Sequence, residues 1–217
     1  MVVEISVRGE AEGRYAAERA VVLLAAVFEG AAKDQMYDHA VALQKAIAGQ
    51  LAELVDRGAV ATWSSDDVAM STHRPWLGDG RRGGLMHVAR IGLSAEFVDF
   101  ERLSGFLDHW SGRDGVEVAG VTWDLLEKNR RWRTAELRRA AVDDAAEKAQ
   151  AYAEAVRRGR VTPIRVADPG LLSPSGGGAV PYALASRMAG GEGNDGLRLT
   201  PAPVVIRVAV EAAFAAD

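Results

Sequence analysis

The four histidines are the side chains of this sequence best suited to bind a metal ion or to transfer a proton. They are His39, His73, His87 and His109. No two of them are four residues apart, so the HExxH spacing that places two imidazoles on one face of a helix is absent. The sequence also contains no cysteine, which excludes disulfides and a thiolate metal site. We therefore expect no metal ion and no cofactor.

Paired carboxylates are the next candidates for chemistry, and they occur at Asp66–Asp67 and at Asp143–Asp144. Neighbouring side chains on a helix point about 100° apart, so Asp143 and Asp144 cannot face each other as an acid and a base. Asp144 instead precedes Lys148 by four residues, the spacing of a surface ion pair worth about 0.3 kcal/mol. The sequence contains neither a GxSxG nucleophile turn nor a phosphate-binding GxxxxGK[ST] loop. We expect no catalytic residue.

One short segment combines aromatic, basic and imidazole side chains around a turn. The segment 75–84 contains four glycines, which is typical of a flexible hairpin connection. A tryptophan between arginines offers an apolar surface and positive charge together. The candidate binding surface consists of His73, Arg74, Trp76, Arg81 and Arg82.

A second basic cluster lies at residues 130–139, where five arginines surround Trp132. Such a cluster could contact a nucleic acid, with the indole stacking on a base. Glu136, Asp143 and Asp144 dilute its charge, and the whole chain carries a net charge of −4. We do not expect a nucleic acid partner.

The periodicity of the apolar residues predicts the elements that position these side chains. It predicts strands near 3–7, 20–28, 85–97, 116–125, 161–166 and 204–212, and an extended segment over 60–72. It predicts helices over 32–57, over 100–110 with Asp99 as N-cap, and over 132–158. The last helix has a narrow apolar stripe that would let it lie close to a sheet: Leu137, Ala141, Ala145, Ala149, Tyr152 and Val156.

This order of elements predicts an α+β fold with largely antiparallel sheets of paired strands packed against three helices. We expect a single domain over 1–217, or alternatively two packed halves of about 1–84 and 85–217. The segment 168–196 is rich in glycine and proline and is expected to be a flexible loop. No secretory signal is present, and the longest apolar run, 20–28, is too short to span a bilayer. We therefore expect a cytoplasmic protein without a membrane span.

Two stretches resemble the SIMPL-domain family, which includes bacterial periplasmic immunogenic and oxidative-stress-associated proteins. The first is the strand Ile5-Ser6-Val7-Arg8-Gly9 with the following Ala17-Glu18-Arg19-Ala20. The second is the helix pattern 141–149 followed by Tyr152-Ala153. Ala17 departs from the pattern, because the family usually has proline there. The resemblance covers nearly the whole chain and implies the family's fold. It implies no catalytic residue, because the family has no established enzymatic mechanism.

The sequence thus predicts a non-enzymatic interaction or assembly module that forms a homo-oligomer or binds a protein partner. The alternative is a small-molecule binding protein or a cryptic enzyme, with a cleft near His73, Trp76 and the 168–196 loop.

Overall fold

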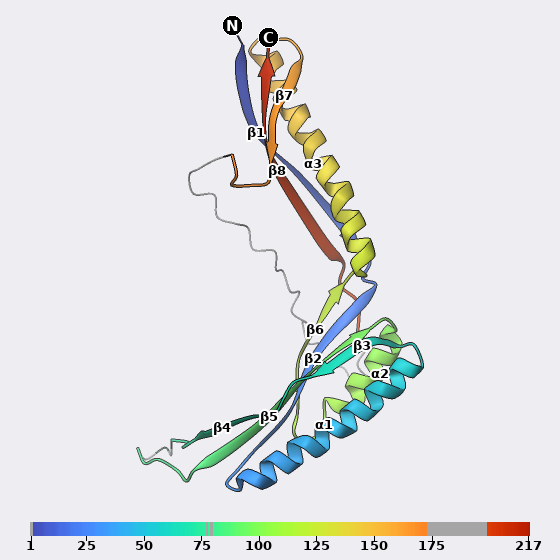
Figure 1. The fold of residues 1–217 in the computed structure, drawn as a ribbon, viewed down its shortest axis with the longest axis vertical. Helices are drawn as coiled ribbons and strands as arrows, with labels where there is room; N and C mark the ends of the chain where they lie inside the picture. Colours follow the sequence, from blue (N-terminus) through green and yellow to red (C-terminus); the bar gives the residue numbers. More distant parts are fainter. Residues whose placement is uncertain (1, 77, 79, 173–198) are drawn as a thin grey trace. The chain divides into compact units, whose positions relative to one another are not determined.

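The computed structural model describes residues 2–76, 78, 80–172 and 199–217, and it confirms an α+β fold with three helices and antiparallel sheets (Figure 1). The residues divide into two compact units. Unit 1 contains residues 2–16, 125–172 and 203–217, and unit 2 contains residues 17–124 and 199–202. These units are not the halves 1–84 and 85–217, because unit 2 is inserted in the chain between segments of unit 1. Residues 173–196 of the expected loop lie outside the described residues.

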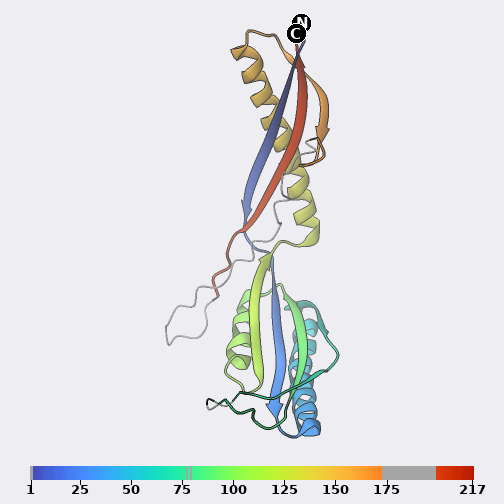
Figure 2. The same ribbon diagram turned by 90° about the vertical axis from the view of Figure 1, so that its left-hand side faces the viewer.

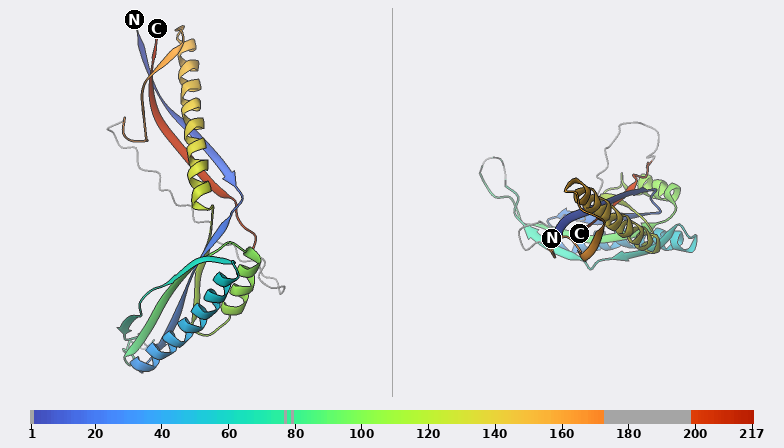
Figure 3. Two further views of the ribbon diagram at one scale, coloured as in Figure 1. Left: turned by 45° about the vertical axis from the view of Figure 1, so that its right-hand side comes forward. Right: turned by 90° about the horizontal axis from the view of Figure 1, so that it is seen from above.

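Unit 1 is a three-stranded antiparallel sheet with one long helix on one face. The strand order is β1 (Val3–Tyr15), β8 (Val204–Ala216), β7 (Val161–Ala167). β1 and β8 pair over thirteen residues, from Val3 opposite Ala216 to Tyr15 opposite Val204. Helix α3 (Glu127–Ala155) runs along β1 and β8, as the left panel of Figure 3 shows. The last strand of the chain is therefore the central strand of this sheet, and the first strand forms one of its edges.

α3 lies very close to β1 because only small side chains separate them. Gly9 of β1 has no side chain, and a Cβ atom there would overlap the carbonyl oxygen of Ala141 and lie 2.8 Å from the Ala145 Cβ. Ala141, Ala145 and Ala149 are fully buried, as the alanine stripe predicts. The close approach thus depends on glycine in the strand and alanine in the helix.

The expected stripe is wrong at its C-terminal end. Tyr152 and Val156 are 60% and 56% exposed, whereas Ala153 is fully buried. The buried residues therefore follow a constant step of four, which advances the contact line by about 40° at each step because a helix turns about 100° per residue. The contact line winds around the helix and follows the twist of the strands. α3 also begins at Glu127, before the expected start at Trp132.

Unit 2 is a sheet with the order β3, β5, β2, β6, and β4 pairs with the other end of β5. The strands are β2 (Arg19–Gly30), β3 (Val60–Ser65), β4 (Ala69–His73), β5 (Met86–Phe97) and β6 (Val116–Asp124). β2 lies between β5 and β6, which agrees with its continuous apolar run 20–28. Figure 2 shows strands β2, β5 and β6 side by side.

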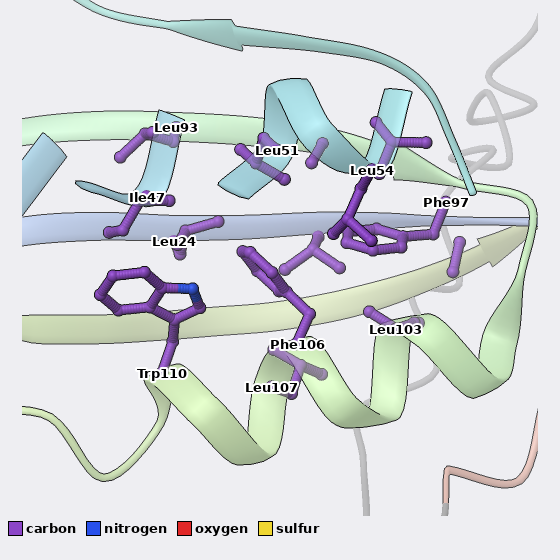
Figure 4. Packing of buried hydrophobic residues seen from close by; sticks show 14 of the residues in the cluster. Leu24, Ile47, Leu51, Leu54, Leu93, Phe97, Leu103, Phe106, Leu107 and Trp110 are labelled. Atoms are coloured by element: carbon purple, nitrogen blue, oxygen red, sulfur yellow. The ribbon is translucent and has the colours of Figure 1, made fainter. Parts of the chain in front are cut away.

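Helices α1 (Lys33–Asp56) and α2 (Phe100–Trp110) pack on the same face of this sheet. Ile47 and Leu51 of α1 meet Phe106 of α2 above Leu24 and Phe97 of the strands, as Figure 4 shows. The Phe97 and Phe106 rings are 5.3 Å apart between centroids. This cluster is the main core of unit 2.

The opposite face of the same sheet has cross-strand ion pairs. The Arg19 guanidinium donates to Glu96 and to Asp124, each at 2.9 Å. Arg90 of β5 pairs with Glu117 of β6. These pairs give this face the polar character of a solvated antiparallel sheet.

Local signals mark the start of α2, as predicted, and the end of α1. The Asp99 carboxylate accepts hydrogen bonds from the N–H groups of Glu101 and Arg102, each at 3.0 Å, and so caps α2. Gly58 follows α1 with a φ of +73°, the left-handed conformation that terminates helices.

We predict opposite effects for alanine at two glycines. Gly9→Ala should lower the free energy of unfolding by about 1–3 kcal/mol, because the new methyl group overpacks the α3 contact. Gly49→Ala should raise it by about 0.5–1 kcal/mol, because Gly49 lies inside α1 with open space around it. Urea unfolding of both variants measures the difference. Equal stability of Gly9→Ala and wild type would contradict the close approach.

Candidate functional site

The five residues of the candidate binding surface all lie on one hairpin, formed by β4, β5 and the segment between them. His73 ends β4, and Arg74 and Trp76 follow it. Arg81 and Arg82 are on the returning arm before β5. The hairpin lies at the end of the sheet away from α2 (Figure 1). The structure thus brings these residues onto one hairpin, while a binding role for them stays a prediction.

Backbone contacts close this hairpin near its tip. The Gly83 N–H donates to the Pro75 carbonyl at 2.8 Å, and Trp76 and Arg82 form an isolated antiparallel bridge. Arg74 Nη1 lies 3.5 Å from the Gly83 carbonyl oxygen. The two arms are therefore held in register although the segment is rich in glycine.

Trp76 is the most exposed aromatic side chain of the hairpin, with 69% of its surface accessible. The Arg82 guanidinium lies 5.2 Å from the centroid of its ring, within the range of a cation–π contact. This contact restrains an indole that otherwise faces solvent. Exposed tryptophan and arginine are the residue types that contribute most to protein–protein binding.

The two histidines of this region make ordinary surface contacts. His73 Nε2 lies 3.4 Å from a Glu29 carboxylate oxygen, and both side chains are about half exposed. His87 Nδ1 lies 3.1 Å from the Thr72 hydroxyl and is half-buried.

A second exposed tryptophan with a stacked arginine lies in unit 1. The Arg133 guanidinium is 4.2 Å from the centroid of Trp132 and 4.8 Å from that of Tyr15, and it also donates to Glu136 at 3.0 Å. Arg131 pairs with Glu127 at 2.6 Å. Carboxylates thus neutralise part of this basic cluster, in line with the expectation that it does not bind nucleic acid, which stays a prediction.

The two best-defined cavities lie elsewhere. A cavity of about 490 Å³ lies between α1 and α2 and is lined by Gln50, Arg57, Asp99 and Arg102 among others. A cavity of about 330 Å³ lies on the sheet face of unit 1 opposite α3, beside Arg8, Arg165 and Glu211. Neither is lined by His73 or Trp76. Neither therefore provides the cleft that the small-molecule alternative requires at those residues.

Glu211 is the one buried charged residue in the part of the chain that the structure describes. The backbone N–H of Gly170 lowers the pKa of its carboxyl group most, and the hydrogen bonds from Arg8 and from the Leu172 N–H lower the pKa further. A general acid needs the opposite, a raised pKa. Glu211 instead joins the chain that follows β7 to the sheet: its carboxylate accepts hydrogen bonds from the Leu172 N–H at 3.3 Å and from the Arg8 guanidinium of β1 at 3.2 Å.

Across the described ranges, no group of three His, Asp or Glu side chains is placed to hold a metal ion. None of the three helices in those ranges is both long and apolar enough to cross a membrane.

Comparison with known families identifies the chain. The model of the SIMPL family, described as a protein of unknown function (DUF541), matches residues 5–214. The chain therefore belongs to the SIMPL family, as the strand at 5–9 and the helix at 141–149 indicated. No curated protein matches it.

We predict that Glu211 contributes to stability above acidic pH only. Its pKa is lower in the folded protein than its ordinary value of 4.5. The contribution is therefore fully present above about pH 4.5 and is lost as the pH falls through the folded pKa. The free energies of unfolding of wild type and Glu211→Gln, measured with urea, should differ at pH 7, and the difference should shrink as the pH falls below about 4.5. A difference that persists unchanged at pH 3 would contradict this role.

Proposed function

We propose that this SIMPL protein is a non-enzymatic interaction and assembly module, and that it forms homo-oligomers through the hairpin of β4 and β5. The observation that carries the proposal is the exposed Trp76 with Arg82 stacked on it. A restrained indole loses little side-chain entropy when a partner covers it. We propose a cytoplasmic location for this assembly.

Charge favours a second copy of the chain as the partner. Residues 74–84 contain three arginines and one aspartate, so they contribute +2 to a net charge of −4. The remainder of the chain therefore carries −6. A basic hairpin on an otherwise acidic protein is complementary to the surface of another copy.

The observations support this function better than the small-molecule alternative. A binding cleft should have convergent polar groups around an enclosed apolar volume. Trp76 is more than two-thirds exposed and His73 is about half exposed, so both face solvent instead.

We predict that Trp76→Ala combined with Arg82→Ala weakens self-association. Truncation of a tryptophan at the centre of an interface typically costs about 2 kcal/mol or more, which is roughly thirtyfold in Kd. Light scattering coupled to gel filtration, over a range of concentrations, measures the mass of each species. Tyr37→Ala is the matched control, because Tyr37 is an exposed aromatic residue of the same unit.

Two results would contradict the proposal. A wild-type protein that stays monomeric at every concentration would exclude the homo-oligomer. An oligomer that survives the double substitution unchanged would exclude the hairpin as its contact.

A further inference from the structure

The outer edge of β1 has an unusual set of backbone contacts. In an antiparallel pair, the N–H and C=O of one residue point to the same side, and successive residues alternate. The Glu10 N–H donates to Asp144 Oδ2 of α3 at 2.7 Å and therefore not to β8. The even-numbered residues of β1 thus direct their backbone groups to the edge opposite β8.

Lys148 completes this contact from the next turn of α3. Its Nζ donates to the Arg8 carbonyl oxygen at 3.1 Å and to Asp144 Oδ2 at 2.7 Å. The Lys148 ammonium, and secondarily the Glu10 N–H, lower the pKa of Asp144, which stays ionised at neutral pH. The Asp144–Lys148 ion pair therefore binds the Glu10 N–H and the Arg8 carbonyl oxygen, a donor and an acceptor in the middle of the β1 edge.

At the other edge of the sheet, the opposite flank of the same helix contacts the chain at the start of β7. The Val161 N–H donates to Gln150 Oε1 at 3.0 Å, and Gln150 Nε2 lies 3.4 Å from the Gly159 carbonyl oxygen. Two residues further on, Pro163 has no N–H to offer, and a β-bulge follows before Arg165. Each of these features interrupts the pairing pattern of an edge strand.

We infer that α3 seals both edges of the unit 1 sheet against strand addition by a second copy of the chain, through Asp144 and Lys148 on β1 and Gln150 on β7. An unpaired edge offers a row of hydrogen-bonding groups to any extended chain. The close contact of Gly9 with Ala141 and Ala145 lets the short Asp144 side chain reach the strand backbone. This role goes beyond the proposed assembly through the hairpin, because it prevents a contact.

The first test measures amide hydrogen exchange at Glu10. Asp144→Ala should speed exchange of this amide by about tenfold, because its acceptor is removed. Asp144→Asn should preserve most of the protection, since the amide oxygen can still accept the hydrogen bond. Glu127→Ala is the matched control, because it breaks an i,i+4 ion pair of the same helix at Arg131.

The second test measures association. Asp144→Ala with Lys148→Ala should form species larger than those of wild type, with a concentration dependence that Glu127→Ala does not show. Asp144→Asn alone should behave as wild type. Neither measurement depends on Trp76. The inference that α3 seals the sheet edges and the proposed assembly through the hairpin can therefore be contradicted separately.

Unchanged Glu10 exchange in Asp144→Ala would overturn the inference. So would a double variant whose size distribution matches wild type at every concentration. Loss of protection in Asp144→Asn equal to that in Asp144→Ala would also overturn it, since charge rather than edge occupancy would then be responsible.

Discussion

The pairing of β1 with β8 is the constraint on which the architecture depends. It joins residues 3–15 to residues 204–216 in one continuous register, and β7 then pairs with the other side of β8. The unit 1 sheet therefore cannot form until the last strand has been added. The entropy of closing so long a loop must be offset by this pairing and by the packing of α3. Unit 2 contains its own core and lies within that loop, so its folding would shorten the distance to be closed.

Small side chains let α3 and β1 lie close together, but they leave little apolar surface to bury between the two elements. Alanine and glycine bury little apolar area, so this interface gains less hydrophobic stabilisation than a leucine stripe would provide. In return, polar side chains on the flanks of the helix come within hydrogen-bonding distance of the strand backbone. Asp144, Lys148 and Gln150 all use this proximity. Spacing alone predicts a minor surface ion pair between Asp144 and Lys148. In the structure, both side chains also bind the backbone of β1.

Local patterns in the sequence predicted the elements well, because periodicity and capping depend on neighbouring residues. Asp99 and the apolar run 20–28 each indicated a feature that the structure contains. The division into units was not predictable in this way, because the partner of a strand is not encoded in the strand itself. Tyr152 was misplaced for a related reason: the twist of the sheet decides which side of the helix is covered. The grouping of the hairpin residues was predictable, because all five lie within ten positions.

The two units differ in the side chains and backbone groups that they expose for binding. In unit 1, α3 contacts the backbone of both edge strands, and the exposed side chains include Trp132, whose ring lies against the Arg133 guanidinium. In unit 2 the hairpin presents Trp76 with Arg82 in the same combination. Side-chain recognition is selective in a way that strand addition is not, because any extended chain can supply backbone hydrogen bonds. Under the proposed assembly, closed edges would suppress open-ended pairing between copies of the chain, while Trp76 and Arg82 would define one contact.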